Sequence, residues 1–321
     1  MNNSLETEPK NIFSKLKARY IFLGLVLINF GWFLVLVLTS RILRIFNPDL
    51  WQFIFRENIF LLDPIVYIIS FGVICWLVFK KMKADRISLK YILGKFPLKK
   101  LKWSDVWIVI FASQFFFIGI SVLTRFFITL IFPDSATNLI ENANQIFIYD
   151  GNNLGLKIIY WLLIFVAVVI VAPIAEEFLF RGVILHRWAT KWGVVPAILL
   201  SSFCFGLIHF NIFFLNLAIW SVFLAFLYLQ TGNLIVPIIA HAFNNFLAFL
   251  AMLGGSISTA SDSATAATED SLKIILIVIF LASIPLCYWL KSSKFTSKVE
   301  HLPYFTNQKG RQKVKEEVSR Y

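Results

Sequence analysis

The sequence contains few cysteines, few charged residues and few acidic residues. Its three cysteines, Cys75, Cys204 and Cys287, lie inside apolar runs with no CxxC or Cys/His spacing, which argues against a disulfide or structural zinc framework. Charged residues make up 15% of the 321 positions and apolar residues 59%, whereas soluble domains have about 25% and about 45–50%. The composition excludes an ordinary soluble globular protein and indicates a chain solvated by lipid.

Long apolar runs are the main feature of the sequence. A bilayer core of about 30 Å requires about 20 apolar residues in a helix, because only helices and closed barrels satisfy their own backbone hydrogen bonds there. We therefore predict an all-α polytopic membrane protein with about eight transmembrane helices. The runs lie at about 20–40, 59–79, 106–132, 156–180, 196–212, 213–230, 234–253 and 272–290, the fifth being short.

Positive charge is unevenly distributed among the connecting segments. Most of the 30 Lys and Arg residues fall in segments on the same side of the predicted spans as the N-terminus. Since short basic loops stay in the cytoplasm, we predict that both termini are cytoplasmic. The net charge of +12 predicts membrane lipids as partners, and no nucleic acid. No organelle transit pattern is present, so a prokaryotic plasma membrane is the expected location.

The fourth run is predicted to end in a charged motif, A-P-I-A-E-E-F-L-F-R-G, at residues 172–182. An ionisable group at mid-bilayer costs about 2.5–3.5 kcal/mol, so such groups usually mark a functional cavity. Glu177 and Arg181 are four residues apart and can pair on one helix face. Glu176 is turned about 100° away and is free to act as a general base in a cavity. The alternative is an interfacial ion pair that only marks the helix end.

Two further polar motifs lie in later apolar runs. Phe205 and His209 are four residues apart in the fifth run, and His241 and Asn245 share a face in the seventh. Each alone is explained by packing or by interhelical hydrogen bonds, worth about 0.6 kcal/mol on average in membranes. Together with Glu176, they supply the groups that activate water and stabilise an oxyanion. We therefore expect these side chains to converge on one cavity.

The three motifs, in this order, resemble the CAAX-protease and bacteriocin-processing (CPBP) family of intramembrane proteases. The EExxxR, FxxxH and HxxxN patterns of that family correspond to Glu176, Glu177 and Arg181, to Phe205 and His209, and to His241 and Asn245. The resemblance covers about residues 156–253. This divides the chain into N-terminal helices and a basic loop (1–155), a catalytic core (156–253), and an exterior loop, last helix and basic tail (254–321).

The resemblance implies an intramembrane endopeptidase that acts on a membrane-associated or prenylated peptide or protein. It implies that Glu176 and His209 activate water and that His241 and Asn245 hold the oxyanion. It also implies supporting roles for Glu177, Arg181 and Phe205. A zinc ion held by Glu176, His209 and His241 is possible, but the HExxH pair of common zinc proteases is missing. We therefore favour a mechanism that requires no cofactor. The alternative function is a non-catalytic scaffold, immunity or transport protein.

Overall fold

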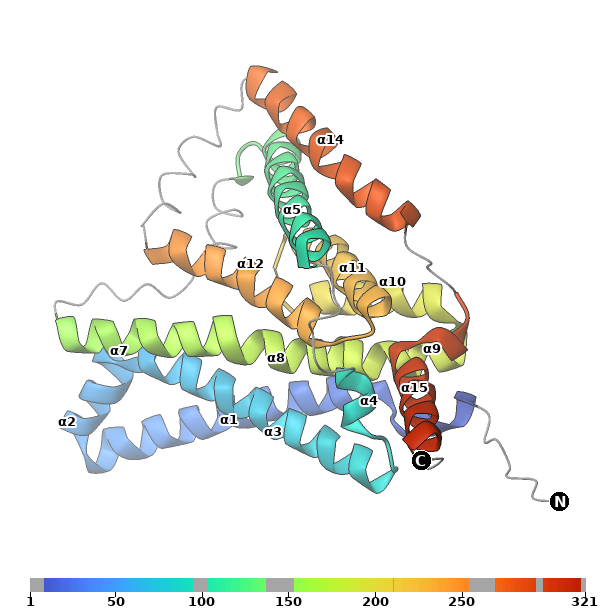
Figure 1. Cartoon of the computed structure of the whole chain (residues 1–321). Helices are drawn as coiled ribbons and strands as arrows, with labels where there is room; N and C mark the ends of the chain where they lie inside the picture. The colour runs from blue at the N-terminus through green and yellow to red at the C-terminus, as the bar shows by residue number, and fades with distance from the viewer. Residues whose placement is uncertain are drawn as a thin grey trace.

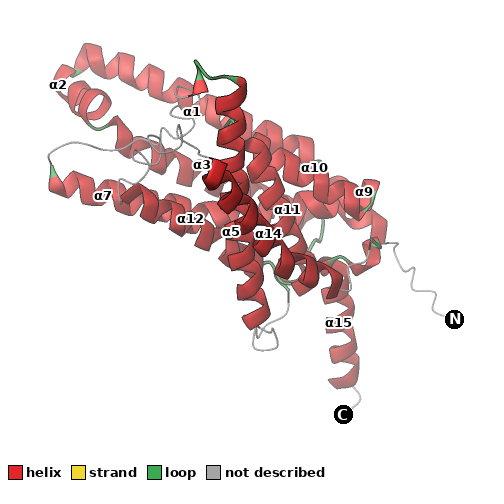
Figure 2. Ribbon diagram, turned by 90° about the horizontal axis from the view of Figure 1, so that it is seen from above, coloured by secondary structure: helices red, strands yellow, loops and turns green. Residues whose placement is uncertain are grey.

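The computed structural model describes residues 9–94, 103–136, 153–209, 211–253, 269–292 and 297–318. This part of the chain is helical and contains no strand (Figures 1 and 2). The helices are α1 (Ala18–Phe46), α2 (Pro48–Trp51), α3 (Leu62–Ala84), α4 (Leu89–Leu93), α5 (Trp103–Ile131), α7 (Leu154–Ile164), α8 (Ala172–Glu177), α9 (His186–Trp192), α10 (Val194–Leu207), α11 (Phe214–Thr231), α12 (Ile235–Leu253), α14 (Glu269–Ser292) and α15 (Pro303–Val318).

Shorter turns of a different pitch connect or interrupt these helices. Tight 3-10 turns occur at Pro9–Lys15 (η1), Ile59–Leu61 (η3) and Val299–His301 (η7). Wider π-helical turns occur at Gln52–Glu57 (η2), Phe165–Val171 (η5) and Phe178–Leu185 (η6).

Six helical stretches of the described chain are long and apolar enough to cross a membrane, which confirms an all-α polytopic membrane protein. The predicted runs at 196–212 and 272–290 coincide with shorter apolar helices, Val194–Leu207 and Lys273–Trp289. The long stretches are Ile12–Phe46, Ile59–Ala84, Trp103–Ile131, Leu154–Trp192, Phe214–Thr231 and Ile235–Leu253.

Two predicted helix ends are wrong. The fourth stretch does not close at the charged motif near residue 180 but continues from Leu154 to Trp192, because the buried run Phe178–Leu185 extends the apolar helix past Arg181. The fifth does not reach residue 212, because α10 ends at Leu207. His209 therefore lies in the turn after α10 rather than inside a helix.

The core of the molecule surrounds the long helix Leu154–Trp192. The residues of η6 are almost entirely buried, and α10 packs closely against both η6 and α11. Gly206 makes the α10–α11 contact possible, since a Cβ atom there would collide with the Phe214 carbonyl oxygen. By contrast, α1 lies at the edge of the bundle and exposes large apolar side chains such as Leu23, Phe30 and Phe33. Exposed apolar side chains of this kind suit contact with lipid.

The predicted cytoplasmic segments meet at one end of the molecule, which we call the basic end. It is formed by η1, α4, α9, α15 and the turn between α11 and α12, on the right of Figure 1. The Asn307 side chain donates to the carbonyl oxygens of Tyr91 and Gly232, at 2.9 Å each. Leu234 N donates to the Leu93 oxygen at 3.2 Å. The side of the cytoplasm itself stays a prediction.

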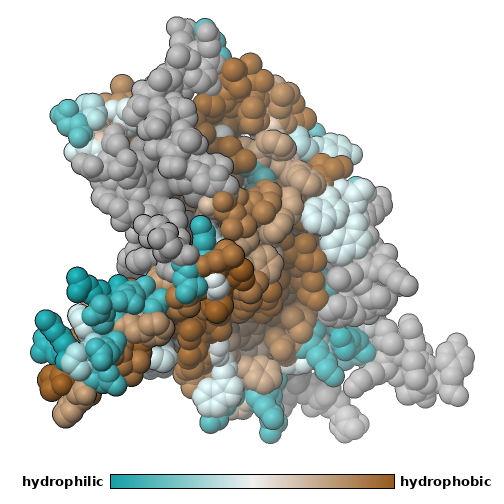
Figure 3. All heavy atoms as spheres, turned by 90° about the vertical axis from the view of Figure 1, so that its left-hand side faces the viewer, coloured by the Kyte–Doolittle hydropathy of each residue, from teal (hydrophilic) through white to brown (hydrophobic). Residues whose placement is uncertain are grey.

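The opposite end of the molecule is seen in Figure 3. Apolar side chains cover much of this face, and hydrophilic ones gather low on it, at the height of α2.

The charged motif at residues 172–182 lies within the helical stretch Leu154–Trp192, which continues beyond the motif in both directions. This arrangement places the motif inside the helical bundle rather than at its surface.

Candidate active site

A proline shapes the helix that contains the charged motif. Pro173 lacks an N–H and its ring crowds the preceding turn, so it removes one backbone hydrogen bond of an ordinary helix and strains that turn. The chain accommodates Pro173 with the wide turn η5 directly before α8, in which Ala172 N donates to the Ala167 oxygen. In this π-helical pattern each N–H donates to the carbonyl five residues earlier, so the Val168 carbonyl would accept from the N–H of residue 173. Pro173 has no N–H to donate. The proline thus widens the helix just before Glu176.

Glu177 and Arg181 form the predicted ion pair. The Arg181 Nη1 atom lies 2.8 Å from Glu177 Oε1, and both side chains are buried. Arg181 Nη2 also donates to the Ser221 carbonyl and hydroxyl oxygens at 2.8 and 2.7 Å. The guanidinium lies over the Phe205 ring, 4.9 Å from its centroid. Because a buried charge is tolerated only when paired and hydrogen-bonded, these contacts stabilise the charged motif inside the bundle.

His241 is oriented by the same carboxylate. Its Nδ1 atom lies 2.9 Å from Glu177 Oε1. An ionised carboxylate can only accept, so Nδ1 is the donor and carries a hydrogen. The imidazole is also held by the Trp220 ring, which packs edge-on with its centroid 5.1 Å away. His241 Nε2 is therefore left facing Glu176, 3.9 Å from its Oε2 atom.

Glu176 lies between three side chains from other elements. Its Oε1 atom accepts from the Tyr67 hydroxyl of α3 at 2.9 Å. Its Oε2 atom is buried, makes no hydrogen bond in the described residues, and lies 4.0 Å from His209 Nε2 and 3.9 Å from His241 Nε2. One carboxylate oxygen is thus fixed, and the other faces two imidazole nitrogens.

His209 is the most accessible member of this group. Its Nδ1 atom donates to the Phe205 carbonyl at 2.7 Å, which leaves Nε2 directed at Glu176. Its side chain is 31% exposed, whereas that of Glu176 is 4% exposed. A cavity of about 560 Å³ is lined by residues on both sides of His209 in the sequence: Leu207, Ile208, Asn211 and Phe214. The exposed part of the group therefore lies at this turn.

Asn245 makes its hydrogen bonds elsewhere. Its Nδ2 atom donates to the Val168 oxygen at 2.8 Å, and its Oδ1 accepts from Asn244 at 3.3 Å. Val168 is the residue whose carbonyl loses its donor to Pro173, so Asn245 replaces the missing N–H. Glu176, His209 and His241 come together as predicted, whereas Asn245 is not hydrogen-bonded to them in the described residues. The second Nδ2 hydrogen remains for another acceptor.

The donor atoms of Glu176, His209 and His241 are of the kind that zinc prefers. The distances between these atoms, however, are longer than those in a zinc site. Two imidazoles and a carboxylate are a common zinc set, and both Nδ1 atoms have the hydrogen-bond partners that ligating histidines need. Bonds of about 2.0–2.1 Å in a tetrahedron place ligand atoms about 3.4 Å apart, not 3.9–4.0 Å. No group of three such residues in the described chain has metal spacing. We therefore derive no step through zinc.

Two residues of the site escaped the sequence motifs. Tyr67 comes from α3, outside residues 156–253, and Ser221 comes from α11. The three motifs consist of acidic, basic, imidazole, amide and aromatic residues and contain no hydroxyl group. A Tyr or Ser hydroxyl in a membrane helix also needs a partner, and that requirement is the signal that could have found them.

The fold and site define a polytopic membrane protein with a buried cluster of acidic and imidazole side chains. Residues 158–247 match the family model described as "Type II CAAX prenyl endopeptidase Rce1-like". This confirms the predicted resemblance over the segment that contains the three motifs.

Two curated mammalian proteins are similar to the same part of the chain. One is CAAX prenyl protease 2 of Homo sapiens, 32% identical over 104 residues, which cover 26% of this chain and 32% of the human protein. Another is CAAX prenyl protease 2 of Rattus norvegicus, 31% identical over 83 residues, which cover 26% of this chain and 27% of the rat protein. The alignment thus spans about a third or less of each relative. No solved structure matches the chain significantly.

Proposed function

We propose that this protein is an intramembrane endopeptidase that hydrolyses a peptide bond of a membrane-associated substrate. The observation that carries the proposal is the convergence of Glu176 Oε2 with the Nε2 atoms of His209 and His241. All three atoms are acceptors when the imidazoles are neutral. A water molecule donates two hydrogens, so it is the natural partner for two of these acceptors.

The proposed reaction is general-base hydrolysis. Glu176 and His209 accept hydrogens from one water, and its oxygen attacks the carbonyl carbon of the scissile bond while a proton passes to Glu176. The tetrahedral oxyanion is stabilised by Asn245, through its second amide hydrogen, and by His241 when Nε2 carries a proton. When the C–N bond breaks, the proton on Glu176 passes to the leaving amine. The products are a carboxylic acid and an amine.

The other site residues hold this arrangement in place. Tyr67 fixes one oxygen of Glu176 and leaves Oε2 for the water. Glu177 orients His241, and Arg181 neutralises Glu177. Phe205 orients His209 through its carbonyl. Substrate enters beside His209, where the cavity lined by Leu207 and Phe214 is largely apolar. An apolar entrance suits a lipid-modified chain, and the name of the mammalian relatives suggests prenylated peptides as the first substrates to test.

Cleavage of a peptide panel tests this function. The purified protein in detergent is given farnesylated, geranylgeranylated and unmodified amphipathic peptides, and products are identified by mass spectrometry. We expect Glu176→Gln and His209→Ala to lower the cleavage rate by about 10²–10⁴-fold, the usual contribution of general acid–base catalysis. Glu57→Gln is the matched control, because Glu57 is an exposed acid of η2 far from the motifs in sequence.

Two results would contradict the proposal. Equal cleavage by the wild type, Glu176→Gln and His209→Ala would remove these residues from the reaction. A folded wild-type protein that cleaves no peptide of the panel would favour the non-catalytic scaffold or transport alternative. A separate arm addresses zinc: protein dialysed against a strong chelator, with metal content measured, is expected to retain its cleavage rate. A rate that falls and recovers when zinc is added would replace the metal-free mechanism.

A further inference from the structure

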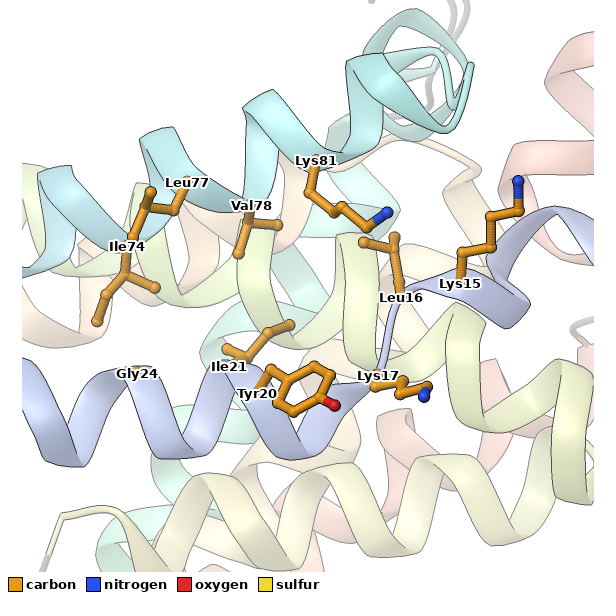
Figure 4. A pocket seen from close by; sticks show the side chains of 10 residues that line it. All are labelled: Lys15, Leu16, Lys17, Tyr20, Ile21, Gly24, Ile74, Leu77, Val78 and Lys81. Carbon is orange, nitrogen blue, oxygen red and sulfur yellow. The ribbon is translucent and has the colours of Figure 1, made fainter.

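A cleft separates the beginning of α1 from the end of α3 at the basic end. Its volume is about 260 Å³. Its lysine amines gather toward the start of α1, around Leu16, whereas most of the apolar side chains lie further along the two helices (Figure 4). The lining residues are Lys15, Leu16, Lys17, Tyr20, Ile21, Gly24, Ile74, Leu77, Val78 and Lys81.

The charged part of the cleft is positive. Lys81 pairs with Asp85 at 2.9 Å, and its side chain is still 51% exposed. Lys15 and Lys17 form no ion pair in the part of the chain that the structure describes; Lys17 only lies over the Tyr20 ring, at 5.8 Å. Three lysines therefore line the cleft, and among the described residues only Lys81 has a carboxylate partner. The remaining positive charge attracts an anion from the membrane surface.

The same charge continues around the start of α1. A second cavity of about 520 Å³ lies between α1 and α9 and shares Lys17 with the first. Arg19, Arg187 and Lys191 line it, and it has no acidic residue among the described residues that line it. Trp188 and Trp192 also line it, and Trp is the residue type that gathers at membrane–water interfaces. The start of α1 is thus surrounded by cations at the expected depth of lipid headgroups.

The apolar part of the cleft has room for a hydrocarbon chain. Gly24 faces open space, since a Cβ atom there would meet nothing within 4 Å. Ile74 and Leu77 of α3 form the other wall. The packing around α1 is loose, with only 6% of its most apolar window buried. A soluble anion would use the lysines alone, whereas a phospholipid would use the lysines and this wall together.

We propose that this cleft binds an anionic glycerophospholipid, with its phosphate at Lys15, Lys17 and Lys81 and an acyl chain between α1 and α3 along Gly24. The site is separate from the Glu176 cluster in its lining residues, and the proposal does not depend on peptidase activity. The bound lipid would fill the space between a loosely packed helix and the core. It would therefore tie α1 to α3.

Native mass spectrometry of the full chain in detergent tests the proposal. The probes are dioleoyl phosphatidylglycerol and dioleoyl phosphatidylcholine, which share acyl chains and differ in net charge. We expect the wild type to bind one phosphatidylglycerol at least tenfold more tightly than phosphatidylcholine. Lys15→Gln with Lys17→Gln should weaken phosphatidylglycerol binding about 25-fold, because a basic residue near the surface contributes about fivefold. The control, Lys80→Gln with Lys83→Gln, removes the same charge from positions on α3 outside the lining.

A second pair of variants tests the apolar wall. Gly24→Leu fills the cleft and should abolish the preference for phosphatidylglycerol. Gly31→Leu adds the same side chain to α1, also in open space, but outside the lining, and should leave the preference intact. Comparing the two lipids within each variant cancels any general loss of stability.

Four outcomes would overturn the proposal. In the first, the wild type binds both lipids equally, and in the second, the two lysine double variants weaken phosphatidylglycerol binding equally. In the third, Gly24→Leu binds phosphatidylglycerol as the wild type does. In the fourth, the wild type binds glycerol 3-phosphate as tightly as phosphatidylglycerol. Displacement of phosphatidylglycerol by a prenylated peptide, one for one, would instead assign the cleft to that peptide and would also overturn the lipid proposal.

Discussion

Two membrane helices of almost equal hydropathy are buried to very different extents. The most apolar windows of Ile12–Phe46 and Leu154–Trp192 have mean hydropathies of 2.6 and 2.8, but 6% of the first and 33% of the second are buried. The second contains Glu176, Glu177 and Arg181, whose charges must be sheltered from lipid. Polar side chains, rather than apolarity, therefore distinguish the core helix from the lipid-facing one.

The largest effect on stability is expected from Arg181. Arg181→Ala leaves the Glu177 carboxylate buried without its cation, which we expect to cost about 3–5 kcal/mol. Arg41→Ala, on exposed α1, should change stability by no more than about 0.5 kcal/mol. Thermal unfolding in detergent measures both. Similar shifts in melting temperature would show that the two helices are not as different as their burial indicates.

Leucine substitutions compare the two helices without changing charge. Leu179 is fully buried and Leu27 is 57% exposed. Leu179→Ala should destabilise by about 2–5 kcal/mol, because it leaves a cavity, and Leu27→Ala by much less. The same unfolding assay provides the measurement. A large cost at Leu27 would mean that a partner, rather than lipid, covers this face of α1.

Tyr67 is expected to influence the reaction more than the fold. Tyr67→Phe removes the donor to Glu176 Oε1, a hydrogen bond to a charged group worth about 1.5–3 kcal/mol. We expect kcat for peptide cleavage to fall at least about tenfold while KM is nearly unchanged. Tyr288→Phe, on an exposed position of α14, is the control. An increase in KM alone would assign Tyr67 to substrate binding instead of positioning Glu176.

The smallest effect concerns the coupling of Pro173 and Asn245. Asn245→Ala should cost about 0.6 kcal/mol, the average for interhelical hydrogen bonds in membranes. In a Pro173→Ala background the backbone N–H returns, so the same substitution should cost less. A double-mutant cycle by thermal unfolding measures the difference. Equal costs in both backgrounds would show that the Val168 carbonyl does not link the two residues.

The sequence predicted the helical class and the pairings that depend on spacing. Glu177 and Arg181 pair because four residues make slightly more than one helical turn, and the same spacing brings His209 Nδ1 to the Phe205 carbonyl in the turn that follows α10. The convergence of Glu176 with His209 and His241 followed from the cost of polar groups in lipid. These predictions needed only local geometry and solvation.

Other features depended on contacts between distant segments. The helix end predicted near residue 180 is wrong because Arg181, although charged, is buried and hydrogen-bonded to Ser221 of another helix. Tyr67 could not be assigned to Glu176 without the packing of α3 on α8. The Val168 contact of Asn245 required the π-helical register that follows from Pro173.

The hydrogen bonds of Asn307 also affect the order in which the protein is assembled. Its side chain joins α15 to the carbonyls of Tyr91 and Gly232, and Tyr304 N donates to His186 Nε2 at 3.4 Å. The Tyr304 bond cannot form until residue 304 has left the ribosome, and the Asn307 bonds cannot form until residue 307 has left it. The six long apolar stretches of the described chain are all synthesised before that moment, so the last closure of this end must follow their translation.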